Sequence, residues 1–179
     1  MKKIPTIFKR NPVNRALVLN EPNPECGWVF KGEGVATRKY DGTCVKISAE
    51  GYFKRREVKA GKTTPTGFVP EMTDSVTGKT VGWVPVGHTS EDQYHWEAYC
   101  EGMAEGTYEL IGPKIQGNPE KLSFHHLMMH NDALKISDAP RDFEGLKAWL
   151  QDKDLEGLVF HHPDGRMAKI KKRDFGFKR

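Results

Sequence analysis

Alternating apolar and polar positions predict short β-strands along most of the chain. In 43–49, Val45 and Ile47 share one face, and Glu50-Gly51 forms a turn before a returning strand over 52–58. A short apolar segment follows at 81–86. Further strands are expected over 29–39 (interrupted by a turn at Gly32 to Gly34), 93–100, 107–112, 157–161 and 166–170. Asp164-Gly165 is a hairpin signal between the last two strands.

One segment has the spacing of an amphipathic helix. Phe143, Leu146, Trp149 and Leu150 fall on one helical face, and Asp142 can cap the first turn. A helix among hairpin-linked strands indicates an α+β fold dominated by antiparallel sheets.

The domain organisation follows from composition along the chain. Residues 1–27 are rich in Pro and Asn and predict an irregular N-terminal arm, and 28–179 predict a single domain. Residues 59–80 carry Gly, Pro, Thr and Ser throughout, which predicts a long loop, either a functional lid or a mobile segment.

Overall composition narrows the class of protein. The chain has 179 residues, of which 37% are hydrophobic and 29% charged, as in soluble globular proteins. A net charge of +4 is compatible with a polyanionic partner without requiring one. Cys26, Cys44 and Cys100 form no CxxC pair, which argues against a disulfide framework and a cysteine zinc site. Without a signal peptide or an apolar run long enough to span a membrane, we expect a cytoplasmic protein, monomeric by default.

Four short segments carry candidate chemistry. They are Lys39-Tyr40-Asp41-Gly42, Tyr108 to Gly112 with Glu109, Glu156 to Phe160, and Ala168 to Lys171. Each alone has an ordinary structural explanation, such as a hairpin turn, a buried strand or an edge strand with solvated lysines.

In this order the four segments resemble motifs I, III, IV and V of the covalent nucleotidyltransferase superfamily, which contains RNA ligases, DNA ligases and capping enzymes. Arg55 lies where the superfamily carries a further arginine, and its neighbour Arg56 is the alternative. A closer resemblance is to the small ATP-dependent RNA 5′-phosphate/3′-hydroxyl ligases. It covers roughly residues 28–175, through the blocks 82–86 (GWVPV), 109–112 (ELIG), 116–119 (QGNP) and 125–130 (HHLMMH).

The candidate residues suit the chemistry that the resemblance implies. A lysine attacks phosphorus only when neutral, and its ordinary pKa is about 10.4. Lys169, Lys171 and a divalent metal would lower that pKa for Lys39, the expected nucleophile. Arg55 and the same two lysines would surround the transferring phosphate. Asp41 and Gly42 are expected to contact ATP, and their tight turn would fix the direction in which Lys39 points.

Further roles concern the metal and the nucleoside. Glu156 is the expected ligand of Mg2+ or Mn2+. The resemblance implies that Glu109 accepts hydrogen bonds from ribose hydroxyls. Tyr40, Phe53 and Phe160 are open alternatives as the platform for the base.

The resemblance implies three steps: ATP forms a lysyl-AMP at Lys39, AMP passes to an RNA 5′-phosphate, and a 3′-hydroxyl then displaces it. Because the chain ends soon after Lys171, we expect no OB-fold domain. RNA would then contact the catalytic domain through residues such as Lys9, Arg10, Arg15 and the basic segment 169–179, unless these are only solvated termini.

Two alternatives stay open. The chain could be a non-catalytic nucleotide- or RNA-binding module on a ligase fold, or an adenylyltransferase with another acceptor such as DNA. His126 and His130 have the spacing of one helix face, but a structural or phosphate-binding role is favoured over zinc. His161-His162 is expected to face solvent. The chain's Trp83, Trp96 and Trp149 are expected in the core.

Overall fold

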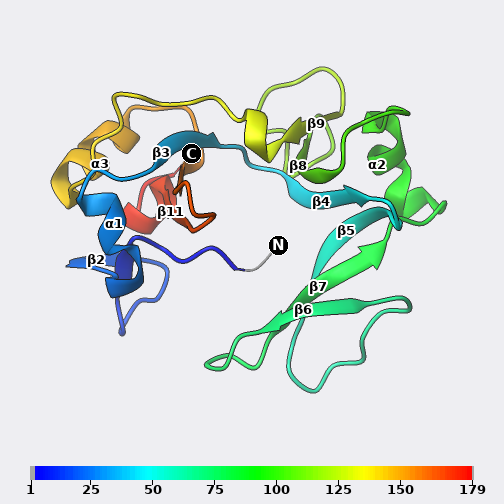
Figure 1. Ribbon diagram of the computed structural model, residues 1–179, viewed down its shortest axis with the longest axis horizontal. Coiled ribbons are helices and arrows are strands. Elements are labelled where there is room, and N and C mark those ends of the chain that lie inside the picture. The colour runs from blue at the N-terminus through cyan, green and yellow to red at the C-terminus, as the bar shows by residue number, and fades with distance from the viewer. Residues whose placement is uncertain (1–2, 179) are drawn as a thin grey trace. The chain divides into compact units, whose positions relative to one another are not determined.

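The computed structural model describes residues 3–178 and divides the chain into two compact units (Figure 1). Unit 1 consists of residues 41–132 together with Lys3. Unit 2 consists of residues 4–40 and 133–178. The domain boundary predicted between residues 27 and 28 stays a prediction. The two units meet along the chain between Tyr40 and Asp41, inside the first candidate motif.

Unit 1 is built on a six-stranded antiparallel sheet in the order β6-β7-β5-β4-β8-β9, drawn in cyan to yellow-green in Figure 1. Its strands are β4 (Thr43–Ser48), β5 (Gly51–Val58), β6 (Val69–Thr73), β7 (Thr80–Pro85), β8 (Gly106–Ile111) and β9 (His126–Met129). Its helical segments are η2 (Ser90–Asp92), α2 (Gln93–Ala98) and η3 (His130–Asp132).

Strand alternation gives this sheet two chemically different faces. Val45 and Ile47 of β4 and Tyr108 and Leu110 of β8 are buried in one hydrophobic cluster. The intervening positions project to the opposite face, because successive side chains of a strand alternate. That opposite face, called here the polar face of unit 1, carries Cys44, Lys46, Phe53, Arg55, Thr107 and Glu109.

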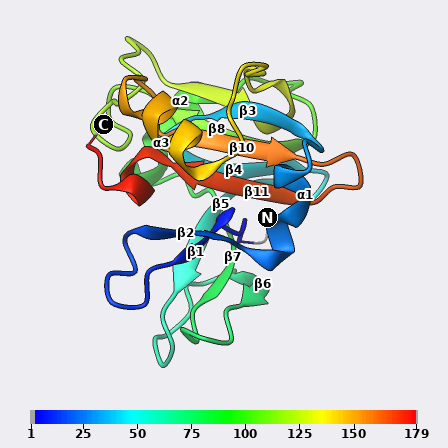
Figure 2. The ribbon, with the colours of Figure 1, turned by 90° about the vertical axis from the view of Figure 1, so that its left-hand side faces the viewer.

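Unit 2 contains a three-stranded antiparallel sheet in the order β11-β10-β3 and a two-stranded ribbon, as Figure 2 shows. Its strands are β1 (Phe8–Arg10), β2 (Val18–Pro22), β3 (Val35–Lys39), β10 (Gly157–His161) and β11 (Met167–Lys171). Its helical segments are η1 (Pro24–Cys26), α1 (Gly27–Phe30), α3 (Phe143–Gln151) and η4 (Lys172–Phe175).

The core of unit 2 lies on one face of its three-stranded sheet. Leu158, Phe160 and Ile170 are fully buried there, together with Leu146 and Leu150 of α3. The Asp142 carboxylate accepts a hydrogen bond from the Gly145 amide at 2.8 Å, so the predicted cap of α3 is confirmed. The expected α+β class with antiparallel sheets is confirmed as well, while its assignment as a nucleotidyltransferase fold stays a prediction.

Three expectations about local structure are wrong. The segment before Gly32 is helical rather than extended, because Asn23 caps and Pro24 opens a helical stretch that leads into α1. Residues 93–98 form α2, in which His95 and Ala98 are buried at helical spacing. The loop expected over 59–80 contains strand β6, paired with β7 across a bulge.

The N-terminal segment is not the irregular arm that its composition predicted. Its described part contains β1, β2 and η1, and Ile7, Phe8 and Cys26 are buried in the core of unit 2. The backbone of Ile7 also bonds to the Lys169 carbonyl of β11 at 3.0 Å. The apolar residues of this Pro- and Asn-rich segment therefore form part of the hydrophobic core of unit 2.

Among residues 3–178, no helix has the length and apolar character needed to cross a membrane.

Candidate active site

Lys39, the expected nucleophile, is the last residue of β3 and lies in a row across the sheet of unit 2. The register pairs Lys39 with Gly157 of β10, and Gly157 with Lys171 of β11. Residues opposite one another in register point to the same face. The side chains of Lys39 and Lys171 therefore project from the face opposite the core, with a glycine between them.

Glu156 links the two lysines. Its Oε2 accepts from Lys39 Nζ at 2.5 Å, and its Oε1 pairs with Lys171 Nζ at 2.5 Å. Only 10% of the Glu156 side chain is exposed. Burial raises the pKa of Glu156, but the charges of Lys39 and Lys171 outweigh burial and lower it below its usual value. Glu156 is thus a carboxylate held ionised between two cations.

Gly157 permits this arrangement because no larger residue fits its place. A Cβ atom there would lie 2.1 Å from the Ile170 carbonyl oxygen and 2.7 Å from the Lys171 Cα. Real Cβ contacts are never so close. The sequence Glu156-Gly157 is therefore a packing requirement of the β10–β11 pair.

Lys169 lies two residues before Lys171 on the same face of β11. Burial lowers the pKa of Lys169 to about 8, and the charges of Lys171 and Lys39 add to the decrease. Glu156 and Asp174 oppose it. We call Lys39, Glu156, Lys169 and Lys171 the lysine–glutamate cluster.

A second carboxylate, that of Asp174, holds the backbone of the lysine–glutamate cluster at Lys171. Asp174, 2% exposed, accepts from the Lys171 amide at 2.9 Å and pairs with Arg10 Nη1 at 2.7 Å. These bonds fix the point where β11 passes into η4, and so the position of Lys171. The sequence analysis missed this role, and took Arg10 only as a candidate for phosphate contact.

The other predicted nucleotide-binding residues lie in unit 1. Glu109 Oε1 accepts from the Gly42 amide at 3.2 Å, and Glu120 Oε1 accepts from the Asp41 amide at 2.9 Å. A Cβ on Gly42 would lie 2.1 Å from the Leu110 carbonyl oxygen. The Asp41-Gly42 turn is thereby held by Glu109 of β8 and by Glu120 of the loop that follows β8. Neither contact was predicted from the sequence, in which Glu109 was a candidate for the ribose and Glu120 had no role.

Arg55 rather than Arg56 lies on the polar face of unit 1. It is half-buried and opposite Trp83 of β7, whereas Arg56 is exposed on the other face of the strand. Phe53 is half-buried on the same face, and Lys46 Nζ lies 4.6 Å from its ring centroid. Lys46 had no place in the sequence-based site, although it lies between Gly42 of the first motif and Arg55.

Burial excludes one of the three aromatic residues that were candidates for stacking on the base. Phe160 is 0% exposed in the core of unit 2, so its proposal as a stacking platform is wrong. Tyr40 and Phe53 are half-buried, and Arg38 covers the Tyr40 ring at 5.1 Å. The choice between these two stays a prediction.

The histidine expectations need correction. His126 begins β9 and His130 begins η3, so the two share no helix face. His161 Nε2 lies 3.0 Å from Thr37 Oγ1, and His162 Nε2 lies 3.0 Å from a Glu33 carboxylate oxygen. Both are half-buried rather than facing solvent.

The three tryptophans that were expected in the core are buried to different extents. Trp83 is 5% exposed, which confirms it as buried. Trp96 and Trp149 are half-buried and pack against the cores of units 1 and 2 respectively. The Trp149 ring nitrogen donates to an Asp138 carboxylate oxygen at 3.2 Å, which keeps one edge of the ring near the surface.

Comparison with known proteins supports one family. A family model described as RNA ligase 1 matches residues 98–179, which include Glu109, Glu156, Lys169 and Lys171. Relatives named RNA ligase 1 are 30% identical in Danio rerio and 29% identical in Mus musculus, over 56% and 55% of this chain. The chain spans less than half of these relatives, 42% and 41% of their lengths. These matches support an RNA ligase family for this chain, in agreement with the resemblance of its motifs.

Proposed function

We propose that the chain is an ATP-dependent RNA ligase that joins a 5′-phosphate to a 3′-hydroxyl through a lysyl-AMP at Lys39 and an RNA-adenylate. One observation carries the proposal: a single ionised carboxylate, Glu156, gathers Lys39 and Lys171 on one face of a sheet, with Lys169 beside them. Three amines around one acid give a net positive site, which suits a phosphate group.

In the first step the Lys39 amine attacks the α-phosphorus of ATP. A nitrogen–phosphorus bond forms, the bond to the bridging oxygen breaks, and pyrophosphate leaves with that electron pair. The amine must lose its proton before or during attack. The ion pair with Glu156 stabilises the protonated form, so weakening that pair activates Lys39.

A divalent metal suits Glu156. Mg2+ binds through one or two carboxylates together with waters and substrate phosphates, and Glu156 is a buried carboxylate with two accepting oxygens. When bound, such a metal would supply positive charge for the transferring phosphate. It would also compete with Lys39 for the same carboxylate.

Lys169 and Lys171 are proposed to stabilise the charge on the phosphate oxygens. Lys169 is suited to this because burial and neighbouring cations already disfavour its protonated form, and an incoming phosphate would relieve that penalty. Asp174 holds the Lys171 backbone in place by accepting its amide hydrogen.

The residues of unit 1 are proposed to bind the nucleoside. Glu109 would accept from ribose hydroxyls, Arg55 would contact phosphate, and the Asp41-Gly42 turn would contact ATP. Transfer of AMP to RNA and sealing by a 3′-hydroxyl rest on the motif resemblance and on the relatives' names.

The direct test is labelling of the protein with α-32P-ATP and Mg2+. The preparation is first treated with pyrophosphate to remove any preloaded AMP, and label is counted after denaturation. We expect acid-labile label on the wild type and on Lys147→Met, an exposed lysine of α3, and none on Lys39→Met. Absence of label on the wild type would overturn the adenylylation step and favour a binding module.

The acceptor is tested separately. Labelled enzyme is incubated with RNA or DNA strands that carry a 5′-phosphate, and transfer of AMP and sealing are followed on a gel. We expect transfer to RNA with formation of a longer product. Preferential transfer to DNA would overturn the RNA acceptor while leaving Lys39 as the nucleophile.

A further inference from the structure

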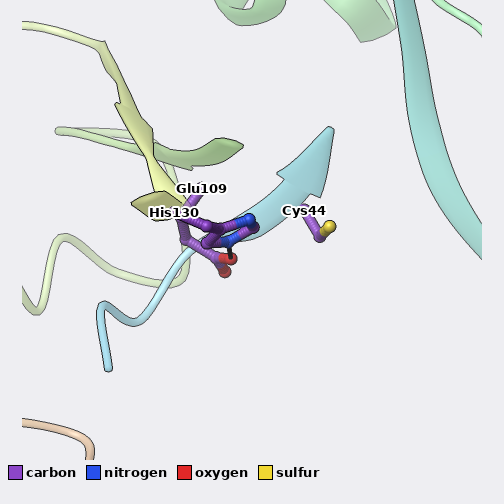
Figure 3. A group of neighbouring side chains, drawn as sticks. All are labelled: Cys44, Glu109 and His130. Carbon is purple, nitrogen blue, oxygen red and sulfur yellow. Dashed lines mark hydrogen bonds and ion pairs between the residues drawn. The ribbon is translucent and has the colours of Figure 1, made fainter. Parts of the chain in front are cut away.

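Cys44, Glu109 and His130 are neighbours on the polar face of unit 1, with His130 against Glu109 and Cys44 to one side of them (Figure 3). Cys44 of β4 lies opposite Glu109 of β8 in the sheet register. Tyr108 pairs with Met129, so the next position brings His130, at the end of β9, opposite Thr107. Thr107 and Glu109 lie two residues apart and share a face. Three neighbouring strands thus present a thiol, a carboxylate and an imidazole on one surface.

The ligand atoms have distances close to those around a metal ion. Cys44 Sγ, a Glu109 carboxylate oxygen and a His130 ring nitrogen all lie within 4.8 Å of one another. His130 Nε2 is 3.1 Å from Glu109 Oε2. Two such ligands, each about 2.0–2.1 Å from a tetrahedral Zn2+, lie about 3.3 Å apart. The nitrogen–oxygen pair therefore needs almost no movement, and the Cys44 sulfur lies within 4.8 Å of both other ligand atoms.

Neighbouring groups already orient two of these side chains. His130 Nδ1 lies 2.9 Å from Thr107 Oγ1, which directs the other ring nitrogen, Nε2, toward Glu109. Glu109 Oε1 accepts from the Gly42 amide, which leaves Oε2 facing His130. A hydrogen bond on the remote nitrogen or oxygen of a ligand is the usual second layer of a metal site.

We propose that Cys44, Glu109 and His130 bind a Zn2+-class cation, with water at the fourth position. On binding, the Cys44 thiol loses its proton to solvent and its sulfur forms the bond to the metal, with no change of oxidation state. Thiolate and imidazole favour Zn2+ over Mg2+, which prefers oxygen ligands only. The site is chemically distinct from Glu156, whose carboxylate forms ion pairs with Lys39 and Lys171.

The chain's sequence gave no sign of this site because its ligands are far apart. Zinc motifs are recognised by cysteine or histidine pairs two to five residues apart, whereas these three ligands are residues 44, 109 and 130. The absence of a CxxC pair argued against a cysteine zinc site, and the present proposal, with Cys44 as one ligand, departs from that expectation. The proposal goes beyond the RNA ligase activity and does not depend on it, and a bound cation would compete with ribose hydroxyls for Glu109.

The test uses Co2+ as a spectroscopic substitute for Zn2+ in the full chain, reduced and freed of metal by a chelator. We expect one Co2+ per chain with a thiolate-to-cobalt absorption band that Zn2+ abolishes. Cys44→Ser should lose the band and His130→Ala should weaken binding at least about tenfold. Cys100→Ser, an exposed cysteine outside the group, is the matched control and should keep both.

A second measurement needs no variant. Alkylation of the wild type by iodoacetamide is followed by mass spectrometry, with and without Zn2+. Protection of Cys44 but not of Cys100 is expected. Equal alkylation of Cys44 in both samples, or a cobalt band that persists in Cys44→Ser, would overturn the proposal and leave a hydrogen-bonded His130–Glu109 pair. Because neither readout involves ATP or RNA, failure here is separable from failure of the ligase proposal.

Discussion

Lys39 Nζ and Glu156 Oε2 form an ion pair at 2.5 Å, and the other oxygen of the same carboxylate pairs with Lys171. The single negative charge of Glu156 thus balances only one of the two positive charges of Lys39 and Lys171, and a third amine, Lys169, lies beside them. The proposed nucleophile is held in place by the residue that is also the proposed metal ligand. Reactivity at Lys39 is therefore expected to depend on what competes for Glu156.

Glu156→Gln should destabilise the protein. The amide removes the negative charge between Lys39 and Lys171, whose side chains are only 18% and 13% exposed, and the two cations then repel each other. We expect a loss of roughly 1–3 kcal/mol in the free energy of unfolding, measured by urea denaturation. Glu144→Gln, an exposed position on α3, is the control and should be nearly neutral. Equal stability of the two variants would contradict a stabilising role for the carboxylate.

Gly157→Ala should be strongly destabilising. The added methyl would lie 2.1 Å from the Ile170 carbonyl oxygen, so β10 and β11 must separate or shift. We expect a cost of about 1–3 kcal/mol or more in thermal or urea unfolding. Gly27→Ala meets no atom within 4 Å and starts a helix, so it should be neutral or slightly stabilising. A stable Gly157→Ala protein would show that the two strands are not held in this register.

Lys169 should make stability rise with pH between about 8 and 10. Its pKa in the folded protein is about 8, against an ordinary value near 10.4 in the unfolded chain. In that window the unfolded chain binds more protons than the folded protein, so raising the pH favours the folded state. Below pH 8 both states carry the charge, and burial of that charge opposes folding.

The Lys169 effect is isolated by comparison with Lys169→Met. The difference in unfolding free energy between this variant and the wild type should be largest below pH 8 and shrink as pH rises toward 10, with the variant favoured at low pH. Titrating groups that do not interact with Lys169 contribute equally to both proteins and cancel. A difference that stays constant over this range would show that Lys169 keeps an ordinary pKa.

Asp142→Ala should weaken α3. The carboxylate accepts from the Gly145 amide at 2.8 Å, one of the amides that lack a partner at a helix start. We expect about 1 kcal/mol of lost stability. Asp142→Asn, which keeps an accepting oxygen, should recover most of it. A loss of equal size in both variants would point to charge rather than capping.

Local patterns predicted much of the fold, but not where long-range packing decided the outcome. Alternation located β4, β5, β8, β10 and β11, since each has one buried face. It failed at α2, where QYHWEAYC alternates as well as a strand but buries His95 and Ala98 at helical spacing. It also missed the N-terminal strands, because the burial of Ile7 and Phe8 depends on α3 and η4, more than 130 residues away along the chain.

In the candidate site too, local motifs were predictable from the sequence and long-range contacts were not. Motif order placed Lys39, Glu156, Lys169 and Lys171 together, and these four side chains are neighbours in unit 2, while their catalytic and binding roles stay predictions. The supports from Arg10–Asp174 and Glu120 could not be predicted, since each joins residues from distant segments by one hydrogen bond or ion pair. Phe160 was misassigned because an aromatic residue in a motif gives no sign of which face it occupies.

In the hairpin of β10 and β11, the lysine–glutamate cluster and the connecting turn lie at opposite ends. Glu156 and Lys171 lie at the open end, whereas the connection at residues 163–166 is exposed and lies beyond five paired residues of each strand. Extra residues inserted between Asp164 and Gly165 would lengthen the turn without altering the pairing that sets the spacing of acid and amines. The turn is thus a natural attachment point for a fluorophore or an affinity tag that leaves the lysine–glutamate cluster undisturbed.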